Sequence, residues 1–365
     1  MSKNSVEHQT TGSAKLSSLL GGNHMGQKFT AKVPSQRITP PEIFFNRRKF
    51  LSAFGLGILA APMATCTAAG ATQRPQDSLI DVPLQRPDVF PAVRNAAYAI
   101  PTAIERKDLV AREVAGSHNN FYEFLSGRGG PVWQFCGDFT VEPWSVEVSG
   151  ECNNPMTLDL DDLFGFEHEE RLYHFRCVER WAMNVPWSGF PLSKLIERAD
   201  PNSQARYVKF TTAAVGDEMP GLKSSPWYPW PYQEALRLDE AMNELAMVVT
   251  GVYGEPLLRQ HGSPVRIIVP WKYGYKNPKS IVKIEFVRNE PRTFWQVQPH
   301  EYGFLSNINP NIPHPRWAQN ISFWLDTEES FETPIFNGYE QFVADLYPDE
   351  PRTRQRALRQ GEIAR

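Results

Sequence analysis

The segment Arg-Leu-Tyr-His-Phe-Arg occupies residues 171–176 and runs directly into Cys177. Its side chains alternate with a period of two, which predicts a β-strand with the cysteine at its end. Farther along, Pro191 opens a predicted short helix, because proline is favoured in the first turn and the following apolar residues share one face. Those apolar residues are Leu192, Leu195 and Ile196.

Similar alternation predicts further strands at 144–148, 207–210, 246–249, 266–269 and 282–286. A turn is expected at Ser149-Gly150, and Thr157 is expected to cap a short helix over 157–164. The predicted helices fall between strands without the regular βαβ period of a doubly wound sheet. The sequence therefore predicts an α+β fold with mixed sheets and short inserted helices.

The composition is that of a globular protein with a substantial core, since 41% of the 365 residues are hydrophobic and 22% are charged. Of the 38 Lys and Arg and the 41 Asp and Glu, eight basic and two acidic residues precede position 72, which leaves 30 basic against 39 acidic residues. A body this acidic lacks the clustered positive field that phosphate contacts need. No nucleic-acid partner is expected.

Residues 1–71 predict an N-terminal extension that ends in a twin-arginine signal peptide. Arg47-Arg48-Lys49 precedes a short apolar run that includes 53–59, and Ala69-Gly70-Ala71 is a small-residue cleavage pattern. The run is too short to span a bilayer, and an amphipathic surface helix is the alternative interpretation. We expect a periplasmic protein delivered by the twin-arginine export machinery. Residues 72–117 then predict a proline-rich extended arm, and 118–365 a single domain.

Four cysteines are too few for a disulfide framework in a chain of this length. Cys136 and Cys152 flank a predicted strand and could form a disulfide, which would leave Cys177 alone. The sequence has no C-x-x-C or H-x-x-x-H spacing typical of zinc sites, no P-loop lysine motif and no Gly-x-Ser-x-Gly motif.

Cys177 stands between Arg176 and Arg180 in the sequence, so nearby positive charge is expected to lower its pKa. Three roles remain open for this thiol. It could be an inert core residue, a nucleophile paired with His174, or a soft ligand to a transition metal. The last role requires an organic cofactor, because one protein sulfur cannot hold a metal alone.

An ordered set of motifs resembles the sulfite oxidase family of molybdenum enzymes over about residues 118–340, and is most similar to its periplasmic protein-methionine-sulfoxide reductases. The motifs are His118-Asn119-Asn120-Phe121-Tyr122-Glu123-Phe124, Phe175-Arg176-Cys177-Val178-Glu179, Pro186-Trp187-Ser188-Gly189-Phe190-Pro191-Leu192, Gly251-Val252-Tyr253-Gly254, His261-Gly262-Ser263-Pro264-Val265-Arg266, Val269-Pro270-Trp271-Lys272-Tyr273-Gly274-Tyr275-Lys276, Glu301-Tyr302-Gly303-Phe304 and His314-Pro315-Arg316-Trp317. Each motif is weak alone, but their order is specific.

The resemblance implies a molybdenum–molybdopterin cofactor whose metal is bound by Cys177. It also implies that the pterin and its phosphate are bound by Asn119, Tyr122, Glu123, Thr212, His261, Arg266, Asn277, Pro278 and Lys279. The residue types suit this task, since Arg266 and Lys279 can neutralise a phosphate. Close relatives usually carry asparagine where His261 stands.

The resemblance further implies the reduction of methionine sulfoxide in oxidised exported proteins, with electrons from a membrane haem-binding subunit. Glu179 would repel anionic sulfite and tolerate a neutral sulfoxide, while Tyr302 would donate a hydrogen bond to the sulfoxide oxygen. Trp181 and Trp187 would line an apolar approach. Two alternatives stay open: a sulfite dehydrogenase or other small S- or N-oxide oxidoreductase, and a cofactor-free exported binding module.

Overall fold

The computed structural model describes residues 79–358 and 362–364, which belong to one compact unit. The extension and export signal predicted at 1–71 lie outside the described residues. Within those ranges, none of the helices combines the length and the apolar character that crossing a bilayer requires.

The larger sheet contains the strand pair on either side of Cys177. Its strands run in the order β1-β6-β7-β10-β11, with β12 paired to β10 and the β14–β15 pair attached to β7. The β6–β7 pair is antiparallel and extends from Glu169–Gly189 to Arg176–Ala182. The bounds are β1 (Val93–Arg94), β6 (Glu169–Arg176), β7 (Trp181–Pro191), β10 (Met247–Val252), β11 (Glu255–Pro256), β12 (Arg266–Ile268), β14 (Ile321–Trp324) and β15 (Ser330–Glu332).

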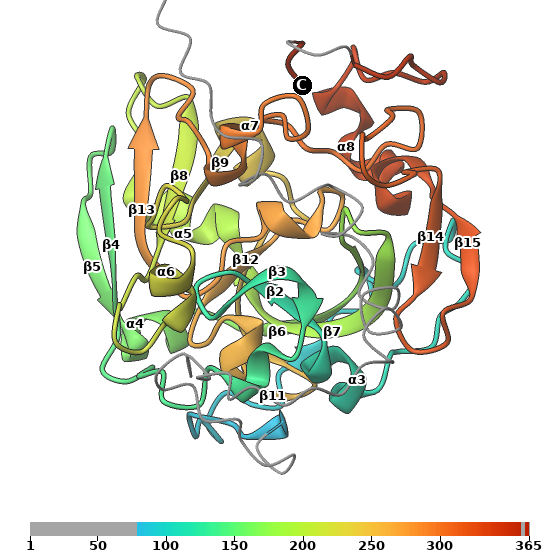
Figure 1. The fold of residues 1–365 in the computed structure, drawn as a ribbon. Coiled ribbons are helices and arrows are strands. Elements are labelled where there is room, and N and C mark those ends of the chain that lie inside the picture. The colour runs from blue at the N-terminus through green and yellow to red at the C-terminus, as the bar shows by residue number, and fades with distance from the viewer. Residues whose placement is uncertain (1–78, 359–361, 365) are drawn as a thin grey trace, which may run out of the picture. The chain divides into compact units, whose positions relative to one another are not determined.

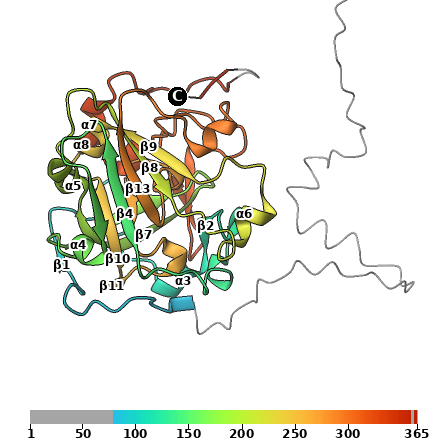
Figure 2. The ribbon, with the colours of Figure 1, turned by 90° about the vertical axis from the view of Figure 1, so that its left-hand side faces the viewer.

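A five-stranded sheet stands beside it in the order β5-β4-β13-β8-β9 (Figures 1 and 2). This sheet is mixed, because β13 is parallel to β4 and antiparallel to β8. A separate hairpin of β2 and β3 carries the first predicted site residues. The bounds are β2 (Asn119–Phe121), β3 (Leu125–Gly130), β4 (Ser145–Gly150), β5 (Met156–Asp159), β8 (Tyr207–Thr212), β9 (Gln233–Arg237) and β13 (Ile281–Val287).

The helices are short and inserted between strands, which confirms the predicted α+β class. The α-helices are α3 (Arg112–Ser117), α4 (Leu160–Phe164), α5 (Leu192–Ala199), α6 (Pro220–Ser224), α7 (Leu238–Ala241) and α8 (Glu340–Val343). Single 3-10 turns lie at η3 (Val132–Gln134), η4 (Arg259–His261), η5 (Gly274–Lys276), η6 (Phe294–Val297), η7 (Ile335–Gly338) and η8 (Ala344–Leu346).

Two local predictions were wrong. Thr157 lies in β5, and α4 is capped instead by Asp159, whose carboxylate accepts a hydrogen bond from the Asp162 N–H at 2.9 Å. The predicted turn at 149–150 is the end of β4, where Gly150 pairs with Phe286 of β13. Gly150 has φ of 93°, and a Cβ there would lie 2.2 Å from the Phe286 carbonyl oxygen, so the last pair of this strand forms only because this residue is glycine. The other predicted strands are confirmed, as is the helix that follows Pro191.

The segment predicted as an arm packs along the larger sheet from residue 79 onward. Its strand β1 pairs in parallel with β6, and the Asn95 N–H donates to the Glu170 carbonyl at 2.8 Å. In the described part of the chain no disulfide joins Cys136 to Cys152. Cys136 lies in a cluster with Phe121, while Cys152 forms an isolated bridge with Pro201.

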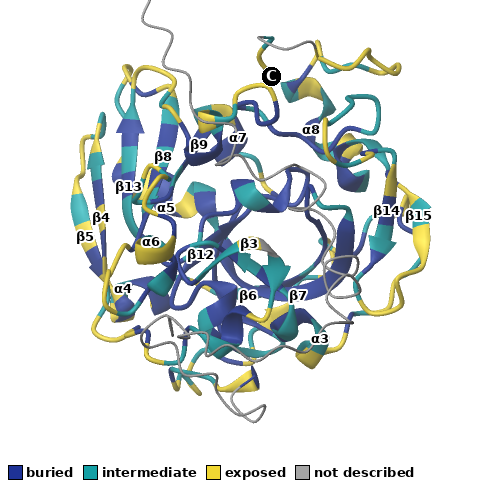
Figure 3. Cartoon of the chain, in the orientation of Figure 1, coloured by how far each residue is buried: buried dark blue, intermediate teal, exposed yellow. Residues whose placement is uncertain are grey.

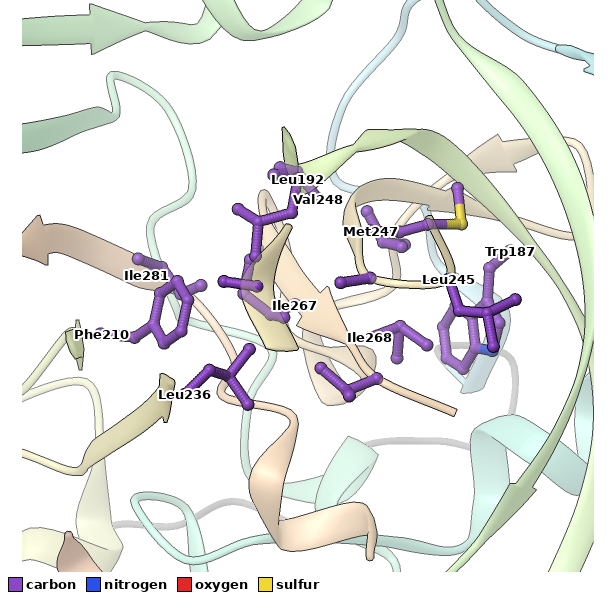
Figure 4. Close-up of a cluster of buried hydrophobic side chains, with 14 of the residues drawn as sticks. Trp187, Leu192, Phe210, Leu236, Leu245, Met247, Val248, Ile267, Ile268 and Ile281 are labelled. Atoms are coloured by element: carbon purple, nitrogen blue, oxygen red, sulfur yellow. The ribbon is translucent and has the colours of Figure 1, made fainter. Parts of the chain in front are cut away.

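The core lies between the two main sheets, where buried strands are flanked by more exposed outer strands such as β5 and β15 (Figure 3). Figure 4 shows Ile267 of β12 among apolar side chains from β10 and from the five-stranded sheet. The labelled side chains are all buried: Trp187, Leu192, Phe210, Leu236, Leu245, Met247, Val248, Ile267, Ile268 and Ile281. This packing fixes β12, which begins at Arg266, relative to the β6–β7 pair.

Candidate active site

Cys177 begins the tight connection between β6 and β7. Its N–H donates to the Trp181 carbonyl at 3.0 Å, and its own carbonyl accepts from the Arg180 N–H at 2.9 Å. Arg180 adopts a left-handed conformation with φ of 81°, which is uncommon outside glycine. The longest strand pair thus ends in a fixed turn that positions the sulfur.

The sulfur lies in a pocket with about 890 Å³ of empty space, part of it open to solvent. All predicted site residues except Thr212 line this pocket. The complete lining is Asn119, Asn120, Phe121, Tyr122, Glu123, Phe175, Cys177, Val178, Glu179, Trp181, Met183, Trp187, Tyr232, His261, Arg266, Gly274, Tyr275, Asn277, Pro278, Lys279, Trp295, Tyr302 and Trp317. These residues come from β2 and the loop after it, β6, β7 and the turn between them, η4, β12, η5, η6 and the loops that follow η5 and η6, and Tyr232 directly precedes β9.

Two donors approach the Cys177 sulfur, namely the Asn120 side-chain amide and the Glu179 N–H, each at 3.5 Å. Burial raises the pKa of the Cys177 thiol, and the nearby Glu179 carboxylate raises it further. The predicted lowering of this pKa was therefore wrong for the protein alone. The charge of Arg176 lowers the pKa of this thiol but does not offset burial, and its guanidinium hydrogen-bonds Ser322 and Gln319 instead of the sulfur.

His174 does not activate the thiol. It is fully buried within β6, and its Nδ1 lies 2.8 Å from Asn184 Oδ1. The thiol–histidine pair that a cysteine nucleophile requires is therefore absent at this position.

Glu179 is anchored beside the sulfur by three donors that meet at Oε2. They are the Trp181 indole N–H at 3.1 Å, the Asn120 amide at 3.2 Å and the Gly129 N–H at 3.3 Å. Asn120 thus bridges the sulfur and the carboxylate, a role that the sequence analysis missed. No local signal could have revealed it, because its partners Cys177 and Glu179 are 57 and 59 positions away.

Asn119 and His261 each present an acceptor to the interior. The carbonyl of Ala115 in α3 accepts from the Asn119 amide at 3.2 Å and from His261 Nε2 at 3.1 Å. Because a carbonyl only accepts, His261 carries its proton on Nε2 and Nδ1 is an acceptor. Asn119 Oδ1 and His261 Nδ1 are both buried with no hydrogen-bond partner in the described ranges. Burial lowers the pKa of His261 to about 4, so the ring is neutral at pH 7.

Arg266 and Lys279 place two cations in the pocket. The Arg266 guanidinium donates to the carbonyls of His261 at 2.7 Å and Asn277 at 3.3 Å, while its Nε has no partner. Burial lowers the pKa of Arg266 to about 9 and that of Lys279 to about 7, and the neighbouring Arg266 charge contributes to the lowering for Lys279. Neither side chain is ion-paired or hydrogen-bonded to a carboxylate within the described residues. Glu123 acts on Lys279 electrostatically without forming an ion pair, so the two buried basic groups have little compensation among the described residues and favour an anionic ligand.

Glu123 and Thr212 form a buried pair, in which the Thr212 hydroxyl donates to Glu123 Oε1 at 2.9 Å. Burial raises the pKa of Glu123 to about 7. Thr212 stands behind this carboxyl group rather than in the pocket. Asn277 has a similar supporting position, because its side-chain amide donates to the carbonyls of Tyr273 at 3.1 Å and Gly274 at 3.2 Å.

Pro278 completes this loop. Its carbonyl accepts a hydrogen bond from the Ile267 N–H of β12 at 3.1 Å. The contact ties the loop to the strand that starts at Arg266 and thereby positions Lys279.

Aromatic side chains form the outer part of the pocket. The Trp295 ring lies 4.9 Å from that of Tyr122 and 5.0 Å from that of Tyr302, measured between centroids. Burial raises the pKa of both tyrosines well above the usual range, and their hydroxyls make no hydrogen bond within the described residues. Both remain protonated donors. Trp187 lies deeper, with the Arg266 guanidinium 5.0 Å from its ring centroid.

This donor set fits a molybdopterin. Among the described residues it offers one soft sulfur, two acceptors without a hydrogen-bond partner and two basic side chains without an ion-paired carboxylate. Pterin N–H groups would supply donors for the acceptors, and a phosphate would face the basic side chains. No cluster of three or more His, Cys, Asp or Glu side chains suited to a metal occurs in the part of the chain that the structure describes.

The fold and the site define an oxidoreductase of the molybdopterin-binding class, and residues 134–295 match the family model described as "Oxidoreductase molybdopterin binding domain". The protein-methionine-sulfoxide reductase catalytic subunit MsrP of Burkholderia mallei is 42% identical over 322 residues, which are 86% of this chain and 93% of the relative. The same subunit of Xanthomonas campestris is 42% identical over 331 residues, covering 88% and 97%. The chain belongs to this family of protein-methionine-sulfoxide reductase catalytic subunits.

Among solved structures, the sulfane dehydrogenase SoxCD from Paracoccus pantotrophus overlaps with 46% of this chain and 46% of its own, with a TM-score of 0.36 and 16% identity.

Proposed function

We propose that this protein binds a molybdenum–molybdopterin cofactor through Cys177 and reduces methionine sulfoxide residues in exported proteins. One observation carries the proposal: the Cys177 sulfur shares its pocket with two buried acceptors that have no hydrogen-bond partner among the described residues, and with two buried basic side chains that form no ion pair with a carboxylate there. Membership of the family of methionine-sulfoxide reductase subunits supports the choice of substrate.

Different pocket residues would bind different parts of the cofactor. Cys177 would bind the metal, Arg266 and Lys279 would face the phosphate, and Asn119 Oδ1 and His261 Nδ1 would accept hydrogen bonds from pterin N–H groups. When bound, the molybdenum centre supplies oxygen-atom transfer coupled to two electrons.

The protein contributes selection and orientation of the substrate. The anchored Glu179 carboxylate lies beside the sulfur, so it disfavours an anion such as sulfite and tolerates a neutral sulfoxide. Tyr302 keeps its proton and donates a hydrogen bond to the sulfoxide oxygen. The rings of Trp295 and Trp317 add apolar surface to the pocket.

We also propose the cellular setting that the sequence predicts. The twin-arginine signal would deliver the folded protein to the periplasm, where a membrane haem-binding subunit would supply electrons. Both proposals rest on the sequence pattern and on the family resemblance.

Metal and pterin analysis of the exported protein tests the proposal. We expect Cys177→Ser to lose molybdenum and methionine-sulfoxide turnover, while Cys152→Ser, which changes a thiol outside the pocket, retains both. Wild-type protein that contains neither metal nor pterin when produced in molybdenum-replete cells would contradict the cofactor assignment. Turnover of sulfite without turnover of sulfoxide would contradict the reaction but leave the cofactor in place.

A further inference from the structure

A loop rich in proline and aromatic residues follows α6. Residues 225–232 read Ser-Pro-Trp-Tyr-Pro-Trp-Pro-Tyr. Trp227 in this loop is 72% exposed, and no other aromatic side chain of the described residues is as exposed. Tryptophan is enriched at interfaces, because its large ring offers apolar contact area and its N–H offers a hydrogen-bond donor.

The loop holds Trp227 in a fixed position. Its three prolines restrict the backbone, and the carbonyl of Ser225 accepts hydrogen bonds from the Trp230 indole at 2.9 Å and the Tyr228 N–H at 3.3 Å. The Ser225 hydroxyl in turn donates to that of Ser126 at 2.6 Å. A preformed surface of this kind loses little conformational entropy when a ligand binds.

The exposed indole is continuous with the pocket. Its ring centroid lies 6.1 Å from that of Tyr228, which in turn lies 5.7 Å from Tyr122 and 5.8 Å from Trp295. Tyr122 and Trp295 both line the pocket that contains Cys177. The path from Trp227 to the pocket wall is therefore no longer than roughly three or four residues of extended chain at about 3.3 Å each.

The depth of the sulfur determines what kind of substrate can use this surface. Cys177 is only 5% exposed, so a reacting side chain must reach into the pocket while its own backbone stays at the rim. An extended segment can insert a side chain this way and at the same time lie across the rim toward Trp227.

We propose that Trp227 and Tyr228, next to the pocket wall at Trp295, form a docking surface for an extended polypeptide segment that carries the methionine sulfoxide. Trp227 binds an apolar side chain three or four residues away from the oxidised methionine. This inference rests on the proposed function, since it specifies the substrate of the same site. An electron-donor subunit is the less suitable occupant, because it would cover the mouth that the substrate must enter.

Steady-state kinetics of the holoenzyme with a reduced viologen dye test the proposal. The substrates are free methionine sulfoxide and a short peptide with methionine sulfoxide and a leucine at the fourth position from it. We expect Trp227→Ala to raise the KM for the peptide about tenfold, equivalent to about 1.4 kcal/mol, without changing turnover of the free amino acid. Trp227→Phe should keep the KM for the peptide close to the wild-type value. Val93→Ala, which shortens an 81% exposed side chain on β1 away from α6, should change neither (Figure 2).

Three results would overturn the docking surface. The first is an unchanged KM for the peptide in Trp227→Ala. The second is an equal rise in KM for both substrates, and the third is a rise in KM seen only when the membrane subunit replaces the dye. If the wild-type protein reduces neither substrate, the proposed function itself fails. Fluorescence anisotropy with a labelled methionine-sulfone peptide then still tests the surface, because Trp227→Ala must weaken its binding if the surface is correct.

Discussion

Lowering the pH should destabilise the molybdenum-free protein through His261. The unfolded histidine has a pKa of about 6.5, whereas burial lowers the folded value to about 4, and the positive charge of Arg266 contributes to the lowering. Between these pH values the unfolded state binds a proton that the folded state does not. The stabilisation that neutral His261 contributes is therefore fully present above about pH 6.5 and is lost as the pH falls toward 4. The difference corresponds to about 3 kcal/mol.

The matched variant is His261→Gln, which cannot titrate and whose amide nitrogen lies at the depth of the His261 Nε2 that donates to the Ala115 carbonyl. Urea unfolding followed by circular dichroism at pH 7 and pH 4 gives the free energy of unfolding for both proteins. We expect the wild-type protein to lose about 3 kcal/mol more than the variant. His174, whose pKa burial also lowers to about 4, contributes equally to both proteins and cancels. Equal pH dependence in the two proteins would refute the assignment of a buried neutral ring at this position.

Three further substitutions test the site and its support. Glu179→Gln keeps an acceptor for its three donors but removes the charge, so sulfite should become a stronger competitive inhibitor of sulfoxide turnover; unchanged inhibition would contradict the repulsion. Gly262→Ala places a Cβ 2.6 Å from that of Lys279 at a backbone φ of 97°. The substitution should lower the free energy of unfolding by about 1–3 kcal/mol, measured by urea unfolding, and should lower the amount of bound pterin, measured by its fluorescence. Lys276→Met leaves its buried partner Glu234, 2.6 Å away, without its ion-pair partner, and should lower the free energy of unfolding, measured with urea, by about 3–5 kcal/mol. A decrease below about 1 kcal/mol would show that the pair is solvated.

The strands around the site could be predicted because their signal is local. The alternation in 171–176 directly reflects the period of a β-strand, and it correctly placed Cys177 at the strand end. The prediction of a helix starting at Thr157 failed because capping depends on which of two nearby polar residues leaves the strand first, and Asp159 does so.

The residues of the pocket were predicted by resemblance, and the structure brings them together from distant parts of the chain. The position and contacts of each residue within the site were not predictable from the sequence. Thr212 lies behind Glu123 instead of in the pocket, and Asn120 links the sulfur to Glu179. These contacts join positions many residues apart, so no local pattern encodes them.

The periodicity of the sequence by itself determined the class of fold, and the resemblance of its motifs to a known family indicated Cys177 as the candidate ligand and the residue types around it. Only the tertiary structure decided the pKa of that thiol, the neutral state of His261 and the exposure of Trp227. All three depend on how much water the packed chain removes from each group, and that quantity is set by segments that are far apart in the sequence.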